Sequence, residues 1–219
     1  MKERPILFSA PMVQAILTGN KTQTRRVVKN KVEGDNCTVI EKLSPPRINV
    51  RDPRFLQFCP YGQVGDRLWV RETWATKIKT VGNTPHEAFT YRATEPNAVA
   101  CYDCNGNELP VKWKPSIFMP RAASRILLEI TGVRVERLHD ISEQDAIAEG
   151  IGFDVIDQAI FFKNYMSKSH FADDDFCNLD DTNAPKKSYF SLWESINGRE
   201  SLDANPWVWV ITFKVVELR

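Results

Sequence analysis

The sequence lacks long hydrophobic segments, and it contains only five cysteines among 219 residues. No apolar run approaches the roughly 18 residues that a membrane-spanning helix needs, and the N-terminus has no hydrophobic signal-peptide core. The cysteines are odd in number and form no tight framework, which indicates reduced thiols. These absences predict a cytoplasmic protein without a membrane partner.

Sequence motifs for common cofactors are also missing. We find no GxGxxG, Walker, HExxH or GxSxG pattern. Cys101 and Cys104 have the spacing of half a zinc site, but there is no second CxxC, and the three histidines are scattered. Because a structural zinc needs about four convergent ligands, we expect no metal and no cofactor. Whether Cys101 and Cys104 bind a metal is left open.

Charge is unevenly distributed, although the formal net charge is only +1. Residues 1–31 contain seven Lys or Arg and one Glu, whereas residues 140–181 contain eleven Asp or Glu and two Lys. A basic segment of this kind suits an anionic partner. The two segments could equally pair with each other.

Hydrophobic periodicity and turn residues predict strands mixed with short helices. The expected helices cover residues 11–17, the segment from Ser142 to Gly150, and the stripe 189–196 that Gly198 ends. The expected strands cover residues 22–28, 67–74, 125–138 and 207–215. The last strand begins apolar on both faces, so it should be central in its sheet.

This order of elements predicts one α+β domain over residues 1–219, a compact mixed β-barrel flanked by short helices. Two stretches carry few periodic signals, at about residues 76–112 and 153–184. We interpret both as loop insertions into the domain.

Lys21 and Thr24 are the first candidates for chemistry. A lysine whose pKa is lowered by burial can activate a nearby hydroxyl as a nucleophile, and the neighbouring Arg25 and Arg26 suit a phosphate or a base edge. Residues 21 and 24 would point to opposite faces of a regular strand. Lys21 must therefore lie in the turn before the strand, or a bulge must intervene. The alternative is a solvated basic turn that leads into an edge strand.

Two further groups are candidates for binding. Trp113, Lys114 and Arg121 belong to a segment that interleaves aromatic and basic residues, on which bases can stack while cations hold phosphates. The alternative is a crossing loop whose tryptophan fills the core. Arg71 and Glu72 could form a cleft wall or a salt bridge at the rim of the barrel.

Four segments together resemble the ASCH-domain family, in particular its longer members carried by phages and prophages. They are GNKTQTRR at residues 19–26, GDRLWVRETW at 65–74, EQDAIAEGI at 143–151 and NPWVWV at 205–210. The resemblance runs from about Pro5 to Phe213, with the two insertions as variable parts.

This resemblance implies a PUA-like β-barrel related to RNA-binding modules. Some small bacterial members of the family are amidohydrolases that release acetate from N4-acetylcytidine, with a lysine, a threonine and a glutamate acting together. Carried over to this sequence, that triad is Lys21, Thr24 and Glu149. The greater length and the aromatic insertions depart from those small enzymes.

Three functions follow from the resemblance. The first is an amidohydrolase that acts on an N4-acylated cytidine-like nucleoside or on the same base within RNA. The second is an RNA-binding module without chemistry, and the third is a ribonuclease. Analogy of fold does not choose among them.

Overall fold

The structure is a computed structural model that describes residues 1–29, 31–33, 36–38, 47–81, 84–156, 159–166, 176–177 and 183–218. The chain divides into two compact units, each made of segments distant in sequence. The first unit comprises Met1–Thr18, Asp66–Glu129 and Val215–Arg219. The second unit comprises Gly19–Gly65 and Ile130–Lys214.

The first unit is built around the parallel pair of β1 (Glu3–Leu7) and β6 (Arg67–Arg71). β6 also pairs antiparallel with the first residues of β11 (Ile126–Arg137). Side chains alternate along β6, so Leu68 and Val70 enter the core while Arg67, Trp69 and Arg71 lie on the opposite face. Helix α1 (Ala10–Leu17) follows β1, begins with a proline in its first turn and is followed by Gly19 at φ +79°.

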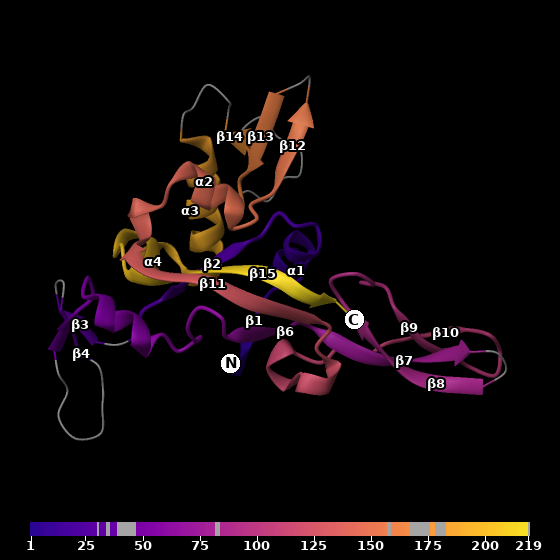
Figure 1. The fold of residues 1–219 in the computed structure, drawn as a ribbon. Helices are drawn as coiled ribbons and strands as arrows, with labels where there is room; N and C mark the ends of the chain where they lie inside the picture. Colours follow the sequence, from indigo (N-terminus) through magenta and orange to yellow (C-terminus); the bar gives the residue numbers. More distant parts are fainter. Residues whose placement is uncertain are drawn as a thin grey trace. The chain divides into compact units, whose positions relative to one another are not determined.

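Two hairpins and two short 3₁₀ segments complete the first unit. β7 (Trp74–Val81) pairs with β8 (Thr84–Tyr91), and β9 (Val99–Tyr102) pairs with β10 (Glu108–Pro110) (Figure 1). The 3₁₀ segments are η2 (Ser116–Phe118) and η3 (Arg121–Ala123). The sequence predicted a loop insertion at about residues 76–112, whereas the described residues form these strands.

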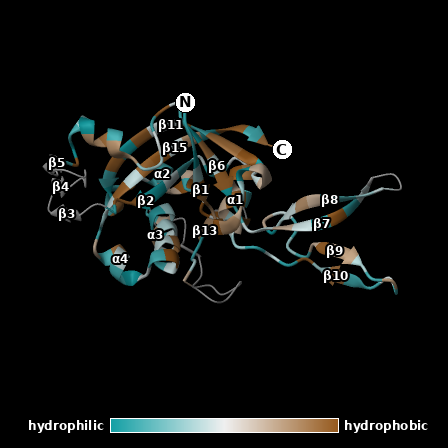
Figure 2. Ribbon diagram, turned by 90° about the horizontal axis from the view of Figure 1, so that it is seen from below, coloured by the Kyte–Doolittle hydropathy of each residue, from teal (hydrophilic) through white to brown (hydrophobic). Residues whose placement is uncertain are grey.

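In the second unit β15 (Trp207–Leu218) lies between β11 and β2 (Gln23–Val27). β15 is rich in tryptophan, valine and isoleucine, which favour strands, and its residues 207–211 are all buried. Figure 2 shows hydrophobic residues along β15, whereas α4 (Arg199–Asp203) is mostly hydrophilic. The last strand was predicted to be central; it is an interior strand of its sheet, flanked by β11 and β2.

Helices cover one face of β15. α2 (Glu143–Ala148) and α3 (Ala184–Asn197) contact each other. Ala146, Tyr189 and Trp193 of these helices share a buried cluster with Val208 and Val210 of β15. This face therefore carries the main apolar contact between helices and sheet in the second unit.

The remaining elements of the second unit are short. They are β3 (Lys31–Glu33), β4 (Asn36–Thr38), β5 (Arg47–Asn49), η1 (Pro53–Phe58), η4 (Leu138–Asp140), β12 (Phe153–Ile156), β13 (Ala159–Lys163) and β14 (Phe176–Cys177). Part of the predicted insertion at 153–184 is thus a three-stranded sheet in the order β12-β13-β14. Its acidic run at residues 173–175 lies outside the described residues.

The α+β class is confirmed, with more strand than helix. Among the residues that the structure describes, no sheet closes on itself, so the barrel stays a prediction. The structure has no helix, within its described ranges, that is both long and apolar enough to cross a membrane.

Candidate functional site

The start of β2 is attached to the end of α2. Lys21 forms an isolated antiparallel bridge with Glu149, and the Thr22 amide donates to the Ala148 carbonyl oxygen at 2.9 Å. The Ser142 side chain caps α2 by accepting from the Asp145 amide. Gly150 follows the helix at φ +77°, a conformation that costs glycine little. Both ends of α2 are thereby fixed, and its residues 145 and 149 face β2.

Lys21 and Glu149 form a buried ion pair. The Lys21 ammonium donates to Glu149 Oε2 at 2.8 Å and to the Glu149 carbonyl oxygen at 2.7 Å. Their side chains are only 1% and 4% exposed. Burial lowers the pKa of Lys21, although the Glu149 carboxylate acts in the opposite direction. A lysine in this setting gives up its proton more readily than one in water.

Arg25 extends the pair into a network. Its guanidinium donates to Glu149 Oε1 at 3.1 Å, to Glu136 Oε1 at 2.6 Å and to Asp145 Oδ2 at 3.1 Å. Burial alone would lower the pKa of Arg25, but the carboxylate of Glu149, Tyr189 and the carboxylate of Glu136 outweigh it and raise that pKa. The guanidinium therefore stays charged and joins α2 to β11 through β2.

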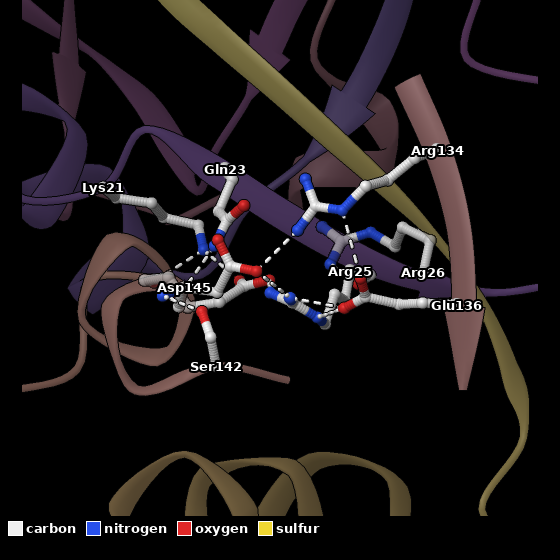
Figure 3. A network of polar contacts seen from close by, with 9 residues as sticks. Lys21, Gln23, Arg25, Arg26, Arg134, Glu136, Ser142 and Asp145 are labelled. Carbon is white, nitrogen blue, oxygen red and sulfur yellow. Dashed lines mark hydrogen bonds and ion pairs between the residues drawn. The ribbon is translucent and has the colours of Figure 1, made fainter. Parts of the chain in front are cut away.

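Arg134 and Asp145 form the more exposed end of the network (Figure 3). Arg134 donates to Asp145 Oδ2 at 2.6 Å and to Glu136 Oε2 at 3.0 Å. Gln23 donates to the Asp145 carbonyl oxygen at 2.6 Å. Partial burial would raise the pKa of Asp145, but a hydrogen bond from Gln23 and the cations of Arg134 and Arg25 lower it.

We call these six charged residues the ion-pair network: three cations, Lys21, Arg25 and Arg134, and three carboxylates, Glu136, Asp145 and Glu149. Exposure rises along it, from 1% for the Lys21 side chain to 41% for that of Arg134. The basic N-terminal segment thus pairs in part with the acidic segment after residue 140. Chemically, the network offers a proton-sharing amine and carboxylate at its buried end and a cation at its outer end.

Thr24 lies on the other face of β2. In the register with β15, Arg25 is opposite Val210, whose side chain packs with α2 and α3, whereas Thr24 is opposite Ile211. Alternate residues of a strand point to opposite faces. The Thr24 hydroxyl is buried and has no hydrogen-bond partner in the described part of the chain. The structure therefore brings together Lys21 and Glu149 of the expected triad, and it leaves Thr24 apart from them.

Arg26 also lies on the Thr24 face, opposite Trp209 in the register, and is half-buried. The sequence analysis did not identify Glu136, Arg134, Gln23 or Asp145 as site residues. One signal was available, because residues 21, 23 and 25 are alternate polar positions on a strand next to the core. That pattern indicates a polar layer between the strand and a helix.

In the first unit Glu72, expected either in a cleft wall or in a salt bridge at the rim, is buried in an ion pair with Arg125. Arg125 donates to Glu72 Oε1 at 2.9 Å and to Oε2 at 3.0 Å, and its guanidinium carbon lies 4.0 Å from the Tyr91 ring centroid. Arg121 pairs with Glu3 at 2.9 Å. Arg71 is half-buried against Trp69. Glu72 is thus engaged within the fold, whereas Arg71 lies on the outer face of β6.

Trp113 and Lys114 lie in the same unit. Trp113 lines a cavity of about 290 Å³ together with residues 96–99, 108, 110 and 111. The exposed Lys114 ammonium lies 4.6 Å from the ring centroid of Trp74, and its backbone exchanges two hydrogen bonds with Trp74. These contacts attach the segment before η2 to the base of the β7–β8 hairpin.

Cys101 is in β9 and Cys104 is in the turn after it, and both are free thiols. Among the residues with described positions, no group of three or more potential metal ligands forms around them or elsewhere.

The contribution of Asp145 to the stability of the fold should depend on pH in the acid range. Its pKa is lowered in the folded protein, so its stabilising contribution is complete above the unfolded value of about 3.9 and is lost as the pH falls toward the folded value. We expect the stability gap between wild type and Asp145→Asn to narrow between about pH 5 and pH 3, as measured by urea unfolding. Asp140→Asn, an exposed residue of η4, is the control. A gap that stays constant would contradict the expectation.

No protein-family model and no curated protein matches the chain. A similar solved structure is that of protein EF3133 from Enterococcus faecalis V583, of family DUF984, with 13% sequence identity and a TM-score of 0.36. The match covers 100% of this chain and 83% of that one. A likeness this distant carries no argument about function.

Proposed function

We propose that the protein is an ASCH-family amidohydrolase that removes the acyl group from an N4-acylated cytidine, as nucleoside or within RNA. The proposal includes a PUA-like barrel as the parent fold. The observation that carries it is the contact between the Lys21 ammonium and the Glu149 carboxylate, 2.8 Å apart and both buried. Perturbed, buried acid–base pairs of this kind are typical of sites of proton transfer.

The pair can carry out both proton transfers of amide hydrolysis, since one group accepts a proton from water and the other donates one to N4. Transfer of the shared proton to Glu149 leaves Lys21 as a neutral amine, which its lowered pKa favours. Lys21 then takes a proton from a water molecule as the water oxygen attacks the acyl carbonyl carbon. The carbon–N4 bond breaks, and Glu149 donates its proton to N4. Cytidine and acetic acid result, and the pair returns to its starting charge.

The outer end of the network suits the negative oxygen that forms during this attack. Arg134 is the most exposed cation of the network, and a guanidinium placed near a developing oxyanion stabilises it. Because Lys21 and Glu149 are almost fully buried, the proposal requires the Arg134–Asp145 contact to open when the substrate binds.

Water is the nucleophile in this proposal. Thr24 would need Lys21 on its own side of the strand in order to lose its proton, and its register places it on the opposite face. Thr24→Val tests this point, because valine keeps the shape of threonine and removes the hydroxyl.

The test is incubation of the purified chain with N4-acetylcytidine and chromatographic detection of cytidine. We expect turnover by the wild type, a loss of at least about 100-fold in Lys21→Met, since general acid–base catalysis contributes on that order, and retained turnover in Thr24→Val. Lys21→Met leaves Glu149 paired with Arg25, so the variant should fold.

Arg125→Met is the matched control, because it removes a cation from the buried ion pair of the first unit. Absence of turnover by folded wild type, or equal rates in Lys21→Met and wild type, would overturn the proposal. Loss of turnover in Thr24→Val would instead indicate that the Thr24 hydroxyl is the nucleophile.

A further inference from the structure

The outer face of β6 carries an arginine, a tryptophan and an arginine at alternate positions. Arg67, Trp69 and Arg71 are each half-buried, whereas Leu68 and Val70 between them are in the core. The rise of a strand, about 3.3 Å per residue, places the two arginine Cα atoms about 13 Å apart with the indole midway.

Both guanidinium groups lack an anionic partner in the part of the chain that the structure describes. Within the described residues neither Arg67 nor Arg71 has an ion pair, and the Nε of each is shielded from solvent without an acceptor. The register brings Glu3 and Glu129 beside Arg67, but the Glu3 carboxylate is engaged by Arg121. A half-buried cation without a carboxylate partner loses part of its solvation free energy, and an anionic ligand would compensate for that loss.

The tryptophan between them is already part of a stack. The Arg71 guanidinium carbon lies 5.5 Å from the centroid of the Trp69 ring, which is within the range of a cation–π contact. Leu7, opposite Arg71 in the register, is 43% exposed and extends the apolar part of this face. A flat apolar surface thus has a cation on each side along the strand.

We propose that this face of β6 binds single-stranded nucleic acid, with one base stacked on Trp69 and backbone phosphates on Arg67 and Arg71. Stacking on an aromatic side chain combined with cations along the backbone is how proteins hold single strands without reading sequence. A duplex hides its bases, and an acidic peptide offers no base to stack. The inference goes beyond the proposed function, since it requires no chemistry at Lys21.

The test uses the full chain and a short fluorescein-labelled oligouridine, with fluorescence anisotropy measured over a series of salt concentrations. Trp69→Leu should weaken binding about tenfold or more and leave the salt slope unchanged. Arg67→Gln/Arg71→Gln should lower the slope of log K against log salt by about 1.4, because each phosphate contact on a single strand contributes about 0.7.

Arg54→Gln/Arg199→Gln is the matched control, since it removes two well-exposed arginines of the second unit that pair with Asp52 and Asp203. Trp69→Phe, which keeps a ring, should retain most of the affinity, and circular dichroism checks that Trp69→Leu is folded. A parallel measurement with oligodeoxythymidine shows whether the site prefers DNA or RNA, and tight binding of either strand supports the inference.

The inference would be overturned if folded wild type bound neither oligouridine nor oligodeoxythymidine. It would also be overturned if the control variant weakened binding as much as the β6 variants do, or if a duplex or polyglutamate bound as tightly as the single strand. Because the probe is unmodified, the outcome does not depend on hydrolysis. Failure of this inference is therefore distinct from failure of the proposed function.

Discussion

Replacing Glu149 by leucine is expected to lower the free energy of unfolding by about 3–5 kcal/mol, the range for breaking a buried ion pair by removal of one partner. In this variant Arg25 keeps Glu136 and Asp145 as partners. Of the two hydrogen bonds that Lys21 donates to residue 149, only the one to the backbone carbonyl oxygen remains. The cost is therefore that of an ammonium group buried without its carboxylate.

The measurement is urea unfolding of wild type and variant, followed by circular dichroism. Glu143→Leu, an exposed acid in the first turn of the same helix, is the control and should cost less than about 1 kcal/mol. The double variant Lys21→Met/Glu149→Leu should recover most of the loss, because it replaces the pair by apolar side chains and leaves Arg25 paired with Glu136 and Asp145. If the loss of stability in the double variant equalled the sum of the losses in the two single variants, the two side chains would not act as a pair.

Replacing Trp209 by alanine is expected to cost about 3–5 kcal/mol, as for other large aromatic residues removed from a core. The side chain is 2% exposed, and its ring stacks on that of Phe55 at 5.0 Å with an interplanar angle of 3°. The stack attaches η1 to β15 within the second unit. Its loss should loosen η1 as well as the core.

Thermal and urea unfolding measure the global effect, and hydrogen exchange of η1 amides measures the local one. Phe55→Ala should have a similar effect, with a coupling of about 0.5–1.5 kcal/mol in the double-mutant cycle. Phe118→Ala, at a side chain that is 68% exposed, should change stability by less than about 0.5 kcal/mol. If Trp209→Ala were as mild as Phe118→Ala, the stack would contribute nothing.

Elements with strong local signals could be predicted from the sequence. The helix after Ser142, its end at Gly150, and the central strand of tryptophan and valine all occur where periodicity and capping residues indicate them. The β7–β8 hairpin was not predicted, because Lys77, Ile78 and Lys79 do not alternate between a buried and a polar face. Its described residues are held largely by their backbone ladder, which leaves little trace in hydropathy.

The candidate site could be predicted only in part for a similar reason. The family resemblance indicated Lys21 and Glu149, which are 128 residues apart in the sequence yet form an ion pair. Glu136 and Arg134 give no local signal, since their role depends on which strand lies beside β2. Thr24 follows the motif in sequence, but strand alternation turns it to the other face.

The long sequence separation within the ion-pair network has a consequence for kinetics. Its contacts between β2 and the later segments join residues 111 to 128 positions apart, and such contacts form only after large loops have closed. We therefore expect these contacts to be largely absent from the transition state for folding. Contacts that form after the transition state slow unfolding and have little influence on the folding rate.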